Sequence, residues 1–194
     1  MQNRTAWMIL IGIAVALVVY VTYLYIPKTV YIDTDGIMYH NGETENTLEK
    51  SLRVQIKGKV YREWFNEKYF RGDLQVEDQT FPVPREKMSL VEIPVGFSMP
   101  TSIVYSFIWP EQKPNLYQYG SLSMNDNYTE AVILISEKRE PSEAEVKQNV
   151  EDTKGWSFDN GLMIAVPAKN REEAVALTNE ILYSYTGIMG LLVK

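Results

Sequence analysis

The residue types that most often perform catalysis are scarce in this sequence, and His40 is the only histidine. A metal site built on His40 would need carboxylates for its other ligands, because the chain has no second histidine and no cysteine. A Ser-His-Asp triad would also depend on His40, yet no Gly-x-Ser-x-Gly nucleophile motif occurs. His40 precedes Asn41 and Gly42, a pair typical of turns, so we predict an exposed turn histidine. We assign no catalytic, cofactor-binding or metal-ligating residue.

The segment Asp33-Thr34-Asp35-Gly36 is similar to the start of a calcium-binding loop. An EF-hand loop needs three alternating oxygen ligands before its glycine and a glutamate six residues after it. This segment supplies two such ligands, and the later position is Gly42. Short β-prone runs flank Asp35-Gly36, so the pattern favours a hairpin turn.

Paired carboxylates are the third kind of candidate for catalysis. Glycosidase-type hydrolysis needs two carboxyl groups that face each other across a cleft, one of them with a raised pKa. The pairs in this chain are sequence neighbours in polar segments, where they do not face each other: Glu43 and Glu45, Glu77 and Asp78, and Glu172 and Glu173. A hydrolase of the cell envelope that uses carboxylates is therefore an alternative and not the leading interpretation.

Aromatic residues are dense in two regions, around residues 64–70 and 109–119. Aromatic rings stack on sugars, so these residues could form a platform for a cell-wall ligand; the candidates are Trp64, Phe65, Trp109 and Tyr117. Aromatic side chains more often fill a core, because each buries a large area. Both interpretations follow from the sequence.

Charge and cysteine content exclude several classes of function. Arg4 is the only charged residue in residues 1–26, so the rest of the chain carries 18 Lys and Arg against 25 Asp and Glu, a net charge of −7. Such a domain is repelled by phosphate backbones and by anionic lipid headgroups, which argues against nucleic acid and against a second, surface-lying membrane contact. The absence of cysteine excludes disulfides, a thiol nucleophile and a lipidated cysteine.

Residues Trp7 to Ile26 form one uncharged apolar segment. An α-helix of this length spans about 30 Å, the hydrocarbon thickness of a bilayer. Trp7 marks one membrane interface, while Tyr20, Tyr23 and Tyr25 cluster near the other. A cleaved signal peptide would have a shorter apolar region followed by small residues. We therefore predict an uncleaved single-pass anchor that ends at Pro27 and contacts the lipid bilayer through residues 7–26.

The anchor divides the chain into a short tail and anchor helix, residues 1–27, and a soluble domain, residues 28–194. Arg4 lies on one side of the anchor and Lys28 on the other, so the positive-inside rule is nearly balanced. A short N-terminal tail before a long domain favours an extracytoplasmic domain, and we expect the protein in the cell membrane with this orientation.

Alternation of apolar and polar residues predicts most of the strands. Ser51 to Tyr61 places Leu52, Val54, Ile56 and Val60 on one face, with Gly58 at a bulge. Further strands are expected at residues 69–77, 102–109, 116–124, 131–136 and 161–166. The prolines at positions 82, 84, 94 and 100 predict a long irregular connection.

Helices are predicted after residues that cap them. A short helical turn is expected at residues 62–68, and Ser142 opens a polar helix to about Asp152. Asn170 caps a helix that ends before Gly187 and has an apolar stripe interrupted only by Thr178. The predicted class is α+β: an N-terminal transmembrane helix, then a mostly antiparallel sheet with helices on one side.

Four segments resemble a group of uncharacterised membrane-anchored proteins of Bacillus-type Gram-positive bacteria. These segments are Ile56 to Tyr61 (IKGKVY), Phe70 to Val76 (FRGDLQV), Met163 to Ala168 (MIAVPA) and Asn170 to Ala174 (NREEA). The resemblance covers scattered blocks of the domain and implies an extracytoplasmic α+β domain behind one anchor. It implies no catalytic residue. Together these observations favour a non-enzymatic binding module of the cell envelope, with an envelope protein or a cell-wall component as partner.

Overall fold

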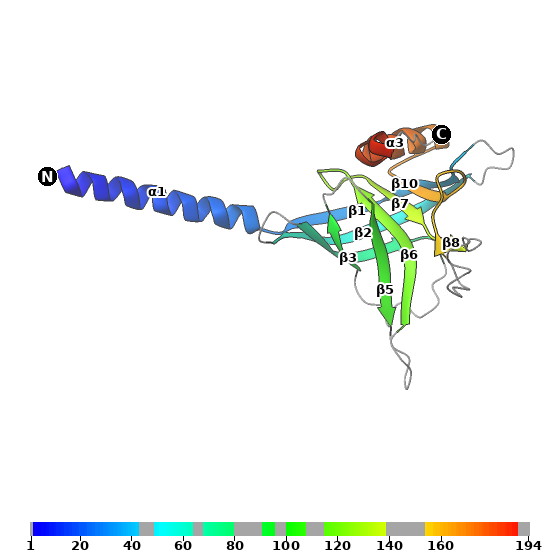
Figure 1. Cartoon of the computed structure of the whole chain (residues 1–194), viewed down its shortest axis with the longest axis horizontal. Coiled ribbons are helices and arrows are strands. Elements are labelled where there is room, and N and C mark those ends of the chain that lie inside the picture. Colours follow the sequence, from blue (N-terminus) through cyan, green and yellow to red (C-terminus); the bar gives the residue numbers. More distant parts are fainter. Residues whose placement is uncertain are drawn as a thin grey trace.

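The computed structural model describes residues 2–42, 49–63, 68–79, 91–95, 100–107, 115–138 and 154–189. A long N-terminal helix precedes a sheet domain that a second helix covers (Figure 1). The elements are α1 (Gln2–Tyr25), β1 (Lys28–His40), β2 (Glu49–Arg62), β3 (Lys68–Val76), β4 (Val91–Val95), β5 (Thr101–Phe107), β6 (Asn115–Met124), β7 (Ala131–Ile135), β8 (Glu137–Lys138), β9 (Lys154–Gly155), β10 (Leu162–Val166) and α3 (Arg171–Met189).

Helix α1 extends away from the domain (Figure 1), and its apolar side chains from Trp7 to Tyr23 are exposed, while Leu24 is half-buried. The stretch Trp7–Tyr25 is long and apolar enough to cross a membrane. The Thr22 hydroxyl donates a hydrogen bond to the Val18 carbonyl oxygen at 2.8 Å, which satisfies the only polar side chain of the segment's second half other than the tyrosines. The helix ends at Tyr25, two residues before Pro27.

Eight strands form one antiparallel sheet in the order β4-β3-β2-β1-β10-β7-β6-β5. The sheet curls so strongly that its two edge strands, β4 and β5, contact each other. The concave inner face encloses the larger core, to which every one of the eight strands contributes. Phe70, Ile56 and Ile133 lie fully buried there.

Helix α3 packs on the convex outer face, over β1, β7 and β10 (Figure 1). The second, smaller core lies between helix and sheet and includes Tyr39, Met163 and Leu182. Asn170 caps the helix, because its Oδ1 atom accepts a hydrogen bond from the Glu173 backbone at 2.9 Å. The α+β class, the antiparallel sheet and the position of a helix on one side are therefore confirmed.

The predicted hairpin turn at Asp35-Gly36 is wrong, because β1 continues through both residues and pairs with β2 along its length. Gly36 has a packing role instead: a Cβ atom there would lie 2.7 Å from the Ala165 carbonyl oxygen of β10. Beyond Gly36 both faces of β1 are covered, with Ile37 under α3 and Met38 in the inner core.

The predicted bulge at Gly58 is also wrong, since pairing with β1 and β3 continues regularly through it. Gly58 lies opposite Gly72, and a Cβ atom on Gly58 would be 2.7 Å from Cε2 of Phe70. The two glycines therefore make room for an aromatic ring that crosses the sheet surface.

Two boundaries differ from the predictions. Pro94 lies inside strand β4, in register with Tyr69, because an edge strand tolerates a residue that cannot donate a backbone hydrogen bond. Helix α3 continues through Gly187 to Met189. The other predicted strands are confirmed as far as the structure describes them, and residues 108 and 109 of the strand expected at 102–109 lie outside the described residues. The helices expected at residues 62–68 and 142–152 lie largely or wholly outside them as well.

Candidate ligand site at the junction of helix and sheet

Of the predicted aromatic platform only Tyr117 lies within the described residues, whereas Trp64, Phe65 and Trp109 lie outside them. Tyr117 is half-buried on β6 and packs against the edge of the inner core. The ammonium group of Lys154 lies 4.6 Å from the centre of its ring. The platform itself stays a prediction. Phe70 and Tyr119, from the same two aromatic regions, are core residues.

His40 lies at the end of β1 and is half-buried, so it is less exposed than a turn histidine would be. Its Nδ1 atom lies 2.8 Å from the carbonyl oxygen of Asn160. Within the described part of the chain, no group of three His, Asp or Glu residues is arranged to hold a metal ion. His40 thus joins the end of β1 to the loop before β10.

Asp33, from the segment similar to a calcium loop, lies in the middle of β1 and is held by three neighbours. Its carboxylate accepts hydrogen bonds from Arg53 Nε at 2.7 Å, Gln55 Nε2 at 2.9 Å and the Tyr31 hydroxyl at 3.0 Å. These donors, Arg53 first, lower the pKa of Asp33 to about 2. The carboxylate is therefore part of a cross-strand network on the outer face of the sheet.

The variant Asp33→Asn should be less stable than the wild type near neutral pH, and this difference in the free energy of unfolding should disappear in acid. The folded-state pKa lies below the ordinary value of 3.8, so charged Asp33 stabilises the fold above that value. This contribution declines as the pH falls from about 4 to about 2. Urea unfolding across this pH interval should show the free energies of unfolding of the wild type and the variant converging. The control Asp35→Asn makes the same charge change on an exposed residue of the same strand, and an equal convergence there would contradict the assignment.

Three members of the sequence-adjacent carboxylate pairs have structural partners: Glu77, Asp78 and Glu173. Glu77 accepts a hydrogen bond from the Arg53 backbone at 2.9 Å, and Asp78 pairs with Lys50 at 2.8 Å. Glu173 accepts one from the Lys169 backbone at 2.9 Å, as expected at a helix N-terminus. Glu43 and Glu45 lie outside the described residues.

One hollow of about 450 Å³ does bring together two carboxylates that are far apart in the sequence. It lies beside the N-terminus of α3, and its lining includes Asp35 and Glu173. A carboxyl group acts as a general acid when burial or a nearby charge keeps its proton. Asp35 and Glu173 are both exposed, and Glu173 is occupied by the turn that starts α3.

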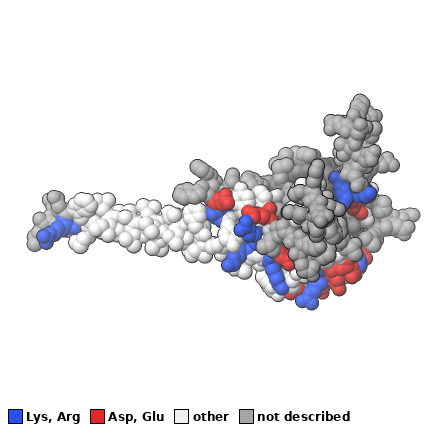
Figure 2. All heavy atoms as spheres, turned by 90° about the horizontal axis from the view of Figure 1, so that it is seen from below, with Lys and Arg blue, Asp and Glu red and all other residues white. Residues whose placement is uncertain are grey.

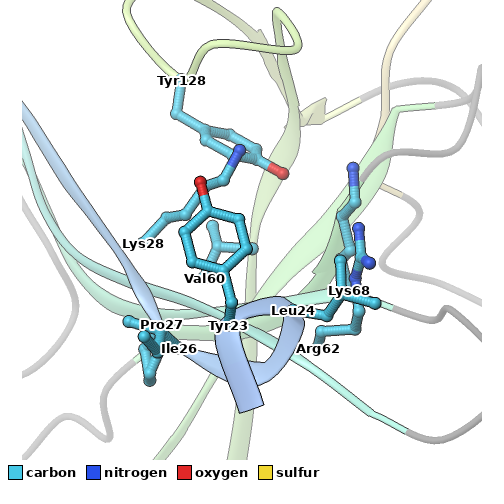
Figure 3. A pocket seen from close by; sticks show the side chains of 9 residues that line it. All are labelled: Tyr23, Leu24, Ile26, Pro27, Lys28, Val60, Arg62, Lys68 and Tyr128. Atoms are coloured by element: carbon cyan, nitrogen blue, oxygen red, sulfur yellow. The ribbon is translucent and has the colours of Figure 1, made fainter. Parts of the chain in front are cut away.

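A different cavity, of about 360 Å³, lies where α1 meets the sheet (Figure 3). The end of α1 and the following two residues form one wall, while the ends of β1, β2 and β3 and the β6–β7 turn form the others. The lining residues are Tyr23, Leu24, Ile26, Pro27, Lys28, Val60, Arg62, Lys68 and Tyr128. Among the described residues of this lining, three are cations and none is a carboxylate. This cavity, which we call the junction cavity, is the candidate functional site.

Strand register places the three cations together. Arg62 pairs with Lys68 across β2 and β3, and Lys28 pairs with Val60 across β1 and β2. Side chains alternate between the faces of a strand, so Arg62 follows Val60 onto the inner face. The site is thus the open end of the concave face, directly above the buried core.

Tyr128 closes the cavity from the turn between β6 and β7, where it is buried. Its backbone has a positive φ of 59°, which is uncommon for a residue with a side chain. Asn125 holds this turn: its Oδ1 atom accepts a hydrogen bond from the Thr129 backbone at 2.9 Å, and its carbonyl oxygen accepts one from Tyr128 at 3.1 Å. The strained turn therefore directs an aromatic ring toward the cations (Figure 3).

Cations on the outer face are arranged differently. There Arg53 pairs with Asp33, Arg71 pairs with Glu92, and Lys57 lies 5.4 Å from the ring centre of Tyr31. Figure 2 shows the mixture of acidic and basic side chains on one side of the domain. Within the described residues, no ion pair joins Lys28, Arg62 or Lys68 to a carboxylate. Like charges directly opposite each other destabilise a strand pair, so Arg62 and Lys68 favour an anion between them.

The pattern of β2 contains part of the signal for this site. The inner-face series Leu52, Val54, Ile56 and Val60 continues by twos to Arg62, a cation where the pattern calls for an apolar residue. Nothing local to the sequence indicates that Lys28, Lys68 and Tyr128 join it, because that depends on the pairing of distant strands.

No protein-family model, no curated protein and no solved structure matches the chain.

Proposed function

We propose that this protein is a membrane-anchored, extracytoplasmic binding module of the cell envelope, which holds its ligand in the junction cavity without transforming it. The observation that carries the proposal is the lining of this cavity. Three cations and two tyrosines supply hydrogen-bond donors and positive charge, and the cavity opens beside the helix that can cross a membrane. Such a lining recognises an anionic group on a ligand at the membrane surface.

The chemistry of the lining supports binding more directly than catalysis. General acid–base catalysis needs a group that can exchange a proton near neutral pH, or a nucleophile beside a base. In the described part of the lining, the polar side chains are one arginine, two lysines and two tyrosines. Arginine keeps its proton and presents several donors in a fixed geometry, which suits recognition of an anion.

The extracytoplasmic position of the domain predicts a labelling pattern in whole cells. The chain lacks cysteine, so a single introduced thiol is the only reactive site. Leu116→Cys places it on an exposed position of β6, where the leucine side chain is 74% exposed, and Arg4→Cys places it at the other end of α1. A membrane-impermeant maleimide should label the first variant in intact cells and the second only after lysis. The reverse pattern would place the domain in the cytoplasm.

The position of the ligand site predicts a crosslinking pattern in intact membranes. A photo-reactive benzophenone amino acid in place of Tyr128 lies in the cavity, and the same amino acid in place of Tyr183 lies on α3, where the side chain is 69% exposed. We expect one recurring class of adduct from position 128, identified by mass spectrometry, and none of that class from position 183. Identical adducts from both positions would contradict a ligand site in the cavity.

A further inference from the structure

We propose that the ligand of the junction cavity is the phosphate headgroup of an anionic phospholipid from the bilayer that α1 crosses. This inference rests on the proposed function and adds the chemical class of the ligand. It is carried by four features of the described residues: the depth of the cavity, the arrangement of its cations, an adjoining apolar groove, and the contrast with the charge of the whole domain.

The cavity lies at the level of the membrane where lipid headgroups are found. Tyr23 and Ile26 line it from the end of α1, and Tyr23 belongs to the tyrosine cluster that ends the apolar segment. Tyrosine and tryptophan side chains concentrate at the interface between hydrocarbon and water. Lys28 follows immediately, at the level where basic side chains meet lipid phosphates. A headgroup therefore reaches the cavity without leaving the bilayer.

The cations are placed to bind one phosphate between two strands. Arg62 and Lys68 are register partners on β2 and β3, and Lys28 contributes from β1. A guanidinium group donates two parallel hydrogen bonds to phosphate oxygens, and an ammonium group adds a point charge. The tyrosine hydroxyls of the lining, which Figure 3 shows, are further donors.

An apolar groove leads from the cavity down the helix. This open hollow, of about 500 Å³, is lined by Val21, Thr22, Tyr25, Ile26 and Pro27. Ile26 and Pro27 line both hollows, so the two lie next to each other at the end of α1. A molecule with an anionic head and an apolar tail fits this pair of surfaces, whereas a free phosphate uses only the first.

The net charge of −7 argued against contact between the domain and anionic lipid. The repulsion comes from the field of the whole domain, which ions in solution screen over about 10 Å. A headgroup inside the cavity lies much closer to Lys28, Arg62 and Lys68 than this distance, and none of the described residues that line the cavity is a carboxylate. The local charge therefore decides recognition at this position.

The test uses the full chain in nanodiscs of phosphatidylcholine, with and without phosphatidylglycerol. Native mass spectrometry measures the lipids that remain bound after mild detergent extraction. We expect the wild type to retain phosphatidylglycerol preferentially. Each cation near a membrane surface strengthens binding of an anionic lipid about fivefold, so Arg62→Gln with Lys68→Gln should weaken retention about 25-fold. The exchange Arg62→Lys with Lys68→Arg keeps both charges and should keep retention.

The matched control is Lys59→Gln with Arg71→Gln. Lys59 and Arg71 are also register partners on β2 and β3, but they alternate with the cavity residues and lie on the outer face. The control removes the same net charge and should leave retention unchanged. An equal loss in both double variants, or no preference for phosphatidylglycerol in the wild type, would overturn the proposal. Circular dichroism in phosphatidylcholine nanodiscs identifies a variant that fails to fold, and the charge-preserving exchange then decides the outcome.

A further arm separates the lipid from a soluble anion. Inorganic phosphate at millimolar concentration should not displace the retained lipid, because it has no tail for the apolar groove. Full displacement would identify a free phosphate as the ligand and overturn the lipid assignment. The crosslinking experiment separates the two proposals. Adducts from position 128 that contain no lipid would overturn only this inference, whereas the absence of specific adducts would overturn the binding function as well.

Discussion

The variant Phe70→Ala should lower the free energy of unfolding by about 3–5 kcal/mol, the largest effect that we expect from a single substitution. Phe70 is fully buried on the inner face of β3. Its ring lies over the paired glycines Gly58 and Gly72, which have no side chains of their own to fill the space. Removing it leaves a cavity against bare backbone, and the neighbouring strands cannot collapse into that cavity without breaking their pairing.

The measurement is urea unfolding of the full chain in detergent micelles, followed by circular dichroism. Tyr61→Ala is the matched control, because Tyr61 precedes Arg62 on β2 and its side chain is 39% exposed. The free energy of unfolding should fall by well under half as much in this control as in Phe70→Ala, because the control removes an aromatic ring without opening a buried cavity. Similar losses in both variants would mean that the ring of Phe70 does not close the inner core.

The variant Leu182→Ala should lower the free energy of unfolding by about 2–5 kcal/mol. Leu182 is buried between α3 and the sheet, in the core that also holds Tyr39. Tyr39 reaches across the same interface, where its hydroxyl donates a hydrogen bond to the hydroxyl of buried Thr178 at 2.8 Å. Loosening the helix exposes both this polar pair and the apolar face of β1. We therefore expect the hydrogen bond and the packing of α3 on β1 to be lost together.

The adjacent residue provides the control for this prediction. Tyr183→Ala removes a larger side chain from the same turn of α3, but that side chain is 69% exposed. This control should change the free energy of unfolding by no more than about 0.5 kcal/mol, as most surface substitutions do. Urea unfolding measures both variants under the same conditions. Equal costs would show that α3 contributes little to the stability of the domain.

Thr178 illustrates how a local pattern can be correct and still incomplete. In the sequence it interrupts the apolar stripe of the last helix. In the structure it is fully buried and pairs with Tyr39, a partner 139 residues away. A buried hydroxyl needs a hydrogen-bond partner, and no local pattern indicates which distant residue provides it.

The errors in the strand predictions have a common origin. The Asp35-Gly36 pair resembled a turn because local sequence signals for turns and for close backbone packing both use glycine. Gly36 packs against the Ala165 backbone, and Gly58 faces Gly72 under the Phe70 ring. In each case a residue distant in sequence made the glycine necessary. Pro94 was excluded from a strand for a similar reason, since only the position of β4 at the sheet edge makes it acceptable.

The sequence by itself determined the apolar helix, most of the strands, the cap at Asn170 and the α+β class. These features depend on hydrophobic length, on alternation with a period of two, and on side-chain contacts within one turn. Only the tertiary structure decided where β1 changes from a half-covered to a fully covered strand, and which cations meet in the junction cavity. The physical reason is register: Lys28, Arg62, Lys68 and Tyr128 come together because distant strands pair and the sheet curls.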